Sequence, residues 1–239
     1  MHQRWSHLLF LHWPVPAATL RPLVPSALEV DTFAGRAYVG LIAFTMTGVR
    51  LAGLPALPGL SACHEVNVRT YVHRGGRDPG VWFFSLDAAN AIAAWGARRF
   101  WHLPYHRARM RLGGVDREPK PDDPPPGTVI TYESERLGPG PMPASCAIRY
   151  EPRGRPSAAA EGTLEHFLAE RYILYARGRR RLDRGRVHHA PYPLQPAEVL
   201  ALEETLIAAA GIIRPAGPPL AHYARQVRAE VFSLQPVGP

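Results

Sequence analysis

The chain has 239 residues, 46% of them hydrophobic, which is enough to bury a core as a single domain over residues 1–239. Its net charge of +8 comes from 28 basic residues, of which Lys120 alone is a lysine, so the charge is weak evidence for a polyanion partner. There is no apolar run near the ~20 residues of a membrane span, no secretory pattern at the N-terminus and no cysteine framework. We therefore expect a soluble cytoplasmic protein with reduced thiols.

The first fifty residues predict two strands with a short helix between them. Residues 5–13 alternate as a strand, residues 17–24 suit a short helix that stops at Pro25, and residues 36–50 are rich in β-branched and aromatic residues. On the second strand, alternation places one set of side chains together: Tyr38, Gly40, Ile42, Phe44 and Met46. The apolar, proline-containing loop 51–62 is expected to fold over a cavity mouth.

Residues 64–72 form the most informative strand. Polar and apolar residues alternate strictly, which puts Glu65, Asn67, Arg69 and Tyr71 on one face and valines and a threonine on the other. An acid, an amide, a guanidinium and a phenol in one row would suit the wall of a wet cavity, because buried charges must be paired and hydrogen-bonded. A solvent-exposed strand with cross-strand pairs is the alternative, and this stretch alone does not decide between them.

A hairpin, a helix and another strand follow. Residues 81–87 predict the second strand of a hairpin, Asp87 is in a helix N-cap position, and residues 88–100 predict a helix that ends before Pro104. Residues 105–112 alternate again. Tyr105, Arg107 and Arg109 share one face of that strand, and His106 lies on the other.

The remaining chain predicts short strands and two helices. Residues 116–127 form a proline-rich extended loop, residues 128–137 and 144–151 a strand pair, and Thr163 caps a brief helix to residue 168. A strand over 171–176 comes next, then a helix over 196–210, and a closing strand over 223–234. Adjacent Cys63 and His64 lack metal-ligand spacing, so neither a metal nor a cofactor is predicted.

The arginine-rich run 177–186 is the best argument for nucleic acid. No aromatic residue interleaves with its arginines, as a base-stacking surface would require. We favour the interpretation that this run is the tip of a hairpin, which makes a nucleic-acid partner the weaker hypothesis.

Several segments resemble a known family. The strand bearing Glu65, Asn67, Arg69 and Tyr71, segment 83–88, the entry 103–105 to the next strand, and segment 167–172 resemble the bacterial YqjF-like family, of unknown function, in the acetoacetate decarboxylase-like superfamily. The resemblance covers about residues 5–234. It implies an α+β, mainly β fold in which a curled, barrel-like sheet with peripheral helices surrounds an internal cavity.

The chain departs from the superfamily at its catalytic lysines. Where the resemblance places two adjacent lysines, one of which forms a Schiff base, this chain has Tyr105 and His106. Lys120 is flanked by prolines and acids, whereas an imine-forming lysine needs a depressed pKa. Decarboxylation through an imine is therefore not expected. The resemblance also carries Glu65 over as a pocket residue.

Three functional hypotheses remain open. The first is a pocket for a small carboxylate or keto acid, with Asn67, Arg69, Tyr71, Arg107 and Arg109 as binding residues and Glu65, Tyr105 and His106 as acid–base groups of a lyase or hydratase type. The second is a binding protein or sensor without catalysis, and the third is a nucleic-acid-associated protein that uses the basic run. The expected partner is a small organic acid, with no membrane association, and assembly into a homo-oligomer stays open.

Overall fold

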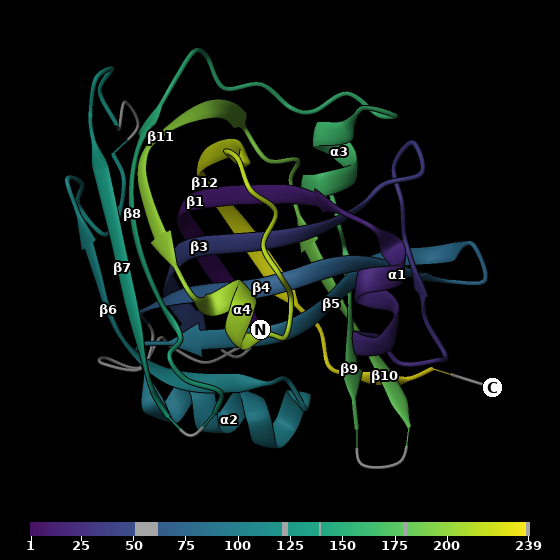
Figure 1. Cartoon of the computed structure of the whole chain (residues 1–239). Coiled ribbons are helices and arrows are strands. Elements are labelled where there is room, and N and C mark those ends of the chain that lie inside the picture. The colour runs from purple at the N-terminus through teal and green to yellow at the C-terminus, as the bar shows by residue number, and fades with distance from the viewer. Residues whose placement is uncertain (51–61, 121–123, 139, 179–180, 238–239) are drawn as a thin grey trace.

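The computed structural model describes residues 1–50, 62–120, 124–138, 140–178 and 181–237, and its strands form one curled sheet with short helices around it (Figure 1). The helices are α1 (Ala17–Leu20), followed by a 3-10 turn (Arg21–Leu23), α2 (Ala91–Trp101), α3 (Leu164–Ala169) and α4 (Leu206–Ala209). The strands are β1 (His2–Val15), β2 (Glu29–Val30), β3 (Ala37–Arg50), β4 (Cys63–Arg74), β5 (Arg77–Ala88), β6 (Tyr105–Gly113), β7 (Ile130–Gly138), β8 (Ser145–Pro152), β9 (Ile173–Arg177), β10 (Leu182–His189), β11 (Leu194–Glu204), β12 (Leu220–Val231) and β13 (Gln235–Pro236).

The sheet closes on itself twice. Its strand order is β13-β10-β9-β5-β6-β7-β8-β11-β12-β1-β3-β4-β2, and two further pairings join β5 to β4 and β10 to β12. One closed ring, the large ring, runs through β5, β6, β7, β8, β11, β12, β1, β3 and β4. The other, the small ring, runs through β9, β5, β4, β3, β1, β12 and β10. Strands β1, β3, β4, β5 and β12 belong to both rings.

A strand shared by two rings is buried on both faces. On β4, Val66 and Val68 pack into the core of the large ring, while Glu65 and Asn67, each 3% exposed, point to the small ring. The same division holds on β3, where Leu41 and Ala43 belong to one core and Ile42, Phe44 and Met46 to another. The face predicted for Ile42, Phe44 and Met46 is confirmed.

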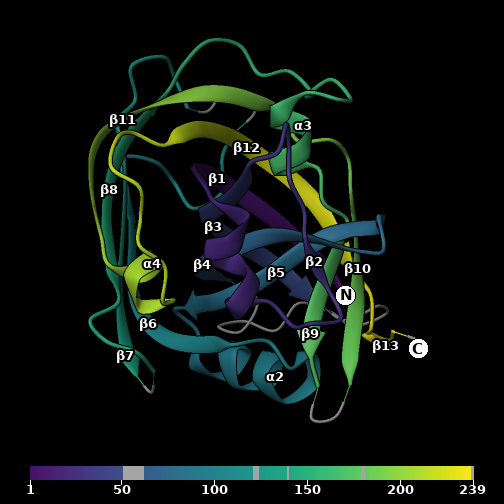
Figure 2. The ribbon, with the colours of Figure 1, turned by 45° about the vertical axis from the view of Figure 1, so that its right-hand side comes forward.

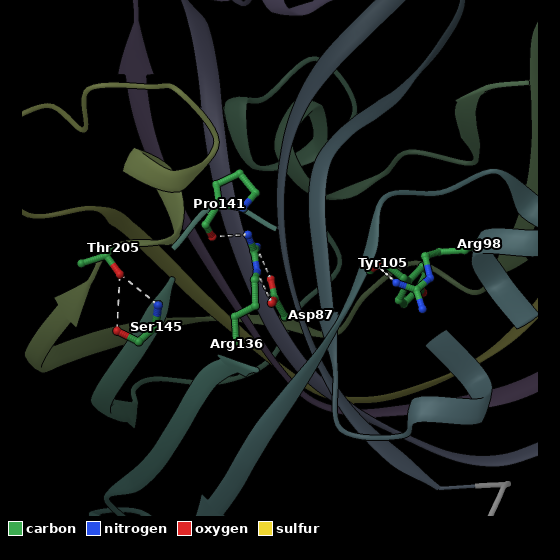
Figure 3. Close-up of polar contacts among 7 residues, drawn as sticks. All are labelled: Asp87, Arg98, Tyr105, Arg136, Pro141, Ser145 and Thr205. Carbon is green, nitrogen blue, oxygen red and sulfur yellow. Dashed lines mark hydrogen bonds and ion pairs between the residues drawn. The ribbon is translucent and has the colours of Figure 1, made fainter. Parts of the chain in front are cut away.

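The helix after β5 forms, but its cap is not Asp87. Asp87 lies within β5, and its carboxylate accepts hydrogen bonds from Arg136 on β7 at 2.6 and 2.7 Å (Figure 3). Asn90 caps α2 instead, since its Oδ1 accepts from the backbone N–H of Ile92 at 3.0 Å. Thr163, in contrast, caps α3 as predicted, because its hydroxyl accepts from the backbone N–H of His166.

The helix predicted over residues 196–210 is wrong. Most of that segment is strand β11, which pairs with β8 and β12, and only Leu206–Ala209 are helical. A β-bulge between Val199 and Ala201 explains the misleading pattern, because it turns Val199 and Leu202 toward the same core although they lie three residues apart.

The other predicted strands and the 17–24 helix are confirmed within a few residues. The predicted loop 51–62 lies outside the described residues except for Ala62, as do residues 121–123 of the proline-rich loop. Among the helices that the structure describes, none has the length and apolar character needed to cross a membrane.

Candidate functional site

A cavity of about 760 Å³, partly open to solvent, is lined by the strands of the small ring. All seven strands of that ring contribute to its wall, and α2 contributes Ile92, Gly96, Ala97 and Trp101. Figures 1 and 2 show α2 running along the lower edge of the sheet, below β5. Most of the wall is apolar. Cavities of this size with a few polar groups are the usual form of small-molecule sites.

The polar row of β4 forms one part of this wall. Glu65, Asn67 and Arg69 all line the cavity, while Tyr71 lies one step further along the same face. Of the two interpretations of this strand, the cavity wall therefore matches its placement, and the solvent-exposed strand does not. The backbone of this row is also fixed from the large-ring side of β4, where the Tyr132 hydroxyl donates to the backbone carbonyl of Glu65 at 2.9 Å.

Glu65 and Tyr105 form a short hydrogen bond inside the cavity. The Tyr105 hydroxyl donates to Glu65 Oε2 at 2.6 Å, and Asn67 Nδ2 donates to Oε1 at 3.3 Å. Burial raises the pKa of Glu65 from its usual 4.5 to about 7, although both hydrogen bonds oppose that rise. Burial and the nearby carboxyl also raise the pKa of Tyr105 well above its usual value. The carboxyl can therefore gain or lose a proton near neutral pH, while the phenol stays protonated.

Arg69 is a half-buried cation without an acidic partner. Its Nη2 donates to the carbonyl of Leu168 at 3.3 Å, and its guanidinium lies 5.9 Å from the Phe10 ring centroid and 5.7 Å from that of Tyr71. In the part of the chain that the structure describes, no carboxylate oxygen lies within 4.0 Å of it, whereas Arg171 pairs with Asp31 at 2.8 Å. The structure thus contains no direct Glu65–Arg69 ion pair.

Three buried polar atoms on residues of the cavity wall lack a hydrogen-bond partner within the described residues. They are Arg69 Nε, Asn67 Oδ1 and Trp101 Nε1. Because an unsatisfied buried donor or acceptor costs about 1–3 kcal/mol, such atoms are usually paired in proteins. All three atoms have almost no accessible surface, so a molecule in the cavity would reach them only after these side chains shift.

Tyr71 is occupied by bonds to the protein. Its hydroxyl donates to the Leu168 carbonyl at 2.6 Å and contacts His12 Nε2, also at 2.6 Å. A carbonyl can only accept, so His12 must be the donor in the second bond. Burial, with Arg69 as the next cause, lowers the pKa of His12 well below its usual value. This chain of bonds makes Tyr71 a support for the Leu168 backbone that Arg69 also contacts.

The other residues predicted for the site lie elsewhere. Arg107 and Arg109 are exposed, and Arg109 donates to Glu135 at 2.8 Å. His106 is not part of the cavity wall, and its ring packs so closely against Gly140 that a Cβ there would approach it to 2.7 Å. Of the residues on β6, only Tyr105 reaches the cavity. Its backbone carbonyl accepts a long bond from Arg98 of α2 at 3.4 Å (Figure 3).

Several polar side chains of the cavity wall were not predicted from the sequence, among them Trp101 and Arg171. Trp101 comes from the last turn of α2, and Arg171 follows α3. A signal for Arg171 was present, because segment 167–172 was one of those that carried the family resemblance. For Trp101 the sequence offered no comparable signal.

Neither the lysine nor the basic run contributes to this site. Lys120 is exposed and lies 3.9 Å from Asp116, and it is not part of the cavity wall. In the basic run, Arg181 pairs with Asp183 and Arg184 with Asp78, at the predicted β9–β10 hairpin. Among the described residues, no three His, Cys, Asp or Glu side chains are placed to hold a metal ion together.

Comparison with known proteins shows a close sequence relationship. The family model DUF2071, described as an uncharacterized conserved protein, matches residues 2–228. The uncharacterized protein YqjF of Bacillus subtilis (strain 168) is 40% identical over 226 residues, which cover 95% of this chain and 88% of the relative. Both findings agree with the resemblance that the sequence segments indicated.

Solved structures with similar folds share little sequence. An acetoacetate decarboxylase-like enzyme from Sphingomonas wittichii RW1 has a TM-score of 0.66 at 14% identity, covering 99% of this chain and 92% of that chain. The enduracididine biosynthesis enzyme MppR, complexed with pyruvate, has a TM-score of 0.67 at 12% identity, covering 99% and 90%. The acetoacetate decarboxylase of Legionella pneumophila has a TM-score of 0.65 at 13% identity, covering 99% and 87%. The predicted acetoacetate decarboxylase-like curled sheet is therefore confirmed.

Proposed function

Because the chain belongs to the DUF2071 family and has an acetoacetate decarboxylase-like fold, we propose that it binds a small organic acid in the internal cavity and acts on it by acid–base chemistry. The observation that carries this proposal is the Arg69 guanidinium, which faces the cavity without a carboxylate partner among the described residues. A half-buried cation is costly unless an anion or several acceptors compensate it. The planar guanidinium fits a carboxylate particularly well, because it can donate two parallel hydrogen bonds.

The neighbouring groups support a role in binding. Asn67 and Trp101 line the cavity, and a turn of these side chains would bring an acceptor, Asn67 Oδ1, and a donor, Trp101 Nε1, to a ligand with a hydroxyl or carbonyl group. One structural relative, MppR, is described in complex with pyruvate, which is a small keto acid. We extend this class of ligand to the present chain as part of the proposal.

For the acid–base step, we assign the proton transfer to Glu65. A carboxyl with a pKa of about 7 is matched to proton transfer near neutral pH. Tyr105 holds that carboxyl by its 2.6 Å hydrogen bond. When Glu65 is protonated and donates to the phenol oxygen, the Tyr105 proton becomes free to polarise a carbonyl of the ligand. The chemistry is of a lyase or hydratase type without an imine, since Lys120 lies outside the cavity wall. His106, Arg107 and Arg109 are not part of this proposal.

The first test is thermal unfolding in the presence of small carboxylates and keto acids. A ligand at 100 times its dissociation constant adds about 2.7 kcal/mol, and each kcal/mol shifts the Tm of a chain of this size by roughly 2–4 °C. We expect at least one acid to stabilise the wild type and Arg107→Leu, but not Arg69→Leu. Both variants remove one positive charge, and Arg107 is exposed, so it is the matched control. An equal shift in Arg69→Leu would refute the assignment of the anion site.

The second test addresses the chemistry. In D2O, the wild type should exchange carbon-bound protons of the stabilising acid for deuterium, which NMR of the ligand detects. Glu65→Gln should bind the acid and exchange nothing, because an amide cannot carry the proton. Binding without exchange by the wild type would refute the acid–base step and leave a binding protein or sensor.

A further inference from the structure

The cavity is much larger than a short keto acid needs. An apolar cavity of about 150 Å³ is sufficient to bind benzene, whereas this one has a volume of about 760 Å³. Filling the remaining space with ordered water would be unfavourable, because most of the wall offers no hydrogen-bond partners. The volume therefore indicates a ligand with a substantial apolar part.

The cavity is also elongated along β4. Cys63, Glu65, Asn67 and Arg69 all contribute to its wall, and they span seven residues, or six steps, of an extended strand. At roughly 3.3 Å per residue, the Cα atoms of Cys63 and Arg69 are about 20 Å apart. A molecule that contacts Arg69 and also fills the Cys63 end must be long rather than compact.

Polarity changes along this length. At the Arg69 end the guanidinium lacks an acidic partner among the described residues, and Glu65, Asn67 and Tyr105 follow on the same wall. Near Cys63 most of the wall comes from apolar side chains, with Gln3 as a polar neighbour. The pairing register places Met46 opposite Cys63 and Phe44 opposite Glu65 on β3, and Trp5 of β1 lies opposite Met46. Arg50, which also lines the cavity, is exposed.

We propose that the ligand of this cavity is a carboxylic acid with a long apolar tail, whose carboxylate binds Arg69 and whose tail lies between Phe44, Met46 and α2. This inference rests on the proposed function, which already places a carboxylate at Arg69. What it adds is the chemical class of the rest of the ligand, a long apolar tail.

Each buried methylene contributes a known amount of binding free energy. About 0.8 kcal/mol per CH2 corresponds to roughly fourfold in the dissociation constant. Four additional methylenes, from butanoate to octanoate, should therefore tighten binding about 200-fold. A cavity that accepted only the head of the molecule would leave the added carbons in water, and no such gain would occur.

The experiment is calorimetric titration of the wild type with butanoate, hexanoate, octanoate and decanoate, with 1-octanol as a probe that lacks the carboxylate. We expect roughly fourfold tighter binding per methylene and much weaker binding of octanol than of octanoate. Arg69→Leu should weaken every acid by a similar factor, and Arg50→Leu should have little effect. Ala97→Phe, which fills space on the α2 side of the cavity, should weaken octanoate and leave butanoate unchanged; its thermal unfolding shows whether it is folded.

The outcomes separate this inference from the proposed function. Equal affinity for butanoate and octanoate, lost in Arg69→Leu, would overturn the apolar tail while the acid site stands. If none of these acids nor any short keto acid binds, both proposals fail. A chain-length gain that depends on Arg50 rather than on Arg69 would overturn the orientation proposed here.

Discussion

Replacing Glu65 by Gln should change how the stability of the protein depends on pH. Burial raises the pKa of this carboxyl from 4.5 to about 7 in the folded state. In the unfolded chain the carboxyl is in water and keeps its usual pKa. Between these two values the folded state therefore holds a proton that the unfolded state releases, and rising pH favours unfolding.

The size of the effect follows from the two pKa values. One pKa unit corresponds to about 1.4 kcal/mol, so the difference between 4.5 and about 7 amounts to about 3 kcal/mol. The wild type has this stability in full below pH 4.5, loses it as pH rises toward 7, and has lost it above pH 7. Glu65→Gln has no carboxyl to ionise, so its free energy of unfolding relative to wild type should increase by about 3 kcal/mol across that range.

Urea unfolding of both proteins at a series of pH values from 4.5 to 8.5 measures this difference. Glu161→Gln is the matched control, and it should follow the wild type because the Glu161 side chain is exposed in the folded protein. A difference between Glu65→Gln and wild type that stays constant over this range would refute the reasoning. So would a difference that falls with rising pH, because it would mean that the folded protein favours the ionised carboxylate.

Two further predictions concern buried groups outside the polar row. Arg136→Met should lower the free energy of unfolding in urea by about 3–5 kcal/mol, because it leaves the Asp87 carboxylate buried without its cation. The control Arg109→Met, at an exposed ion pair, should lower it by about 0–1 kcal/mol. Equal losses of stability in the two variants would contradict this account. Burial raises the pKa of the Cys63 thiol to about 12, so a thiol reagent at pH 8 should modify it slowly in the folded protein and quickly in urea. Rapid labelling of the folded protein would show that the thiolate is accessible.

The placement of the β4 polar row could be predicted because strand alternation is a local property. Each side chain of Glu65, Asn67 and Arg69 had to point to the same face once the segment was extended. Which element covers a given face of a strand, in contrast, depends on residues far away in the sequence. Tyr105, Arg107 and Arg109 also share a face of β6, yet only Tyr105 lies at the cavity while the two arginines are exposed. The residue pattern of a single strand does not reveal how far along that strand the cavity extends.

Irregular backbone explains the largest errors. The bulge after Val199 gave a strand the spacing of a helix. In β1, a register shift between Ser6 and Leu9, with His7 at φ 51°, leaves Trp5 on the cavity wall and Leu9 in the other core, whereas the strict alternation expected over residues 5–13 would place both on one face. Bulges depend on the partner strand, so a pattern within one segment does not reveal them.

The ion pair of Asp87 shows the same limit for polar residues. As a residue before a predicted helix, Asp87 had the chemistry of an N-cap, and only the position of Arg136, 49 residues away, gives it a different role. The pair is 1% exposed at both side chains and joins β5 to β7 across the large ring. A charged side chain on a strand that belongs to both rings therefore points into the interior of one ring, where it needs a partner of opposite charge. Asp87 has one in Arg136, whereas Arg69 has no acidic partner among the described residues, and this difference is the reason to look for its partner in a bound acid.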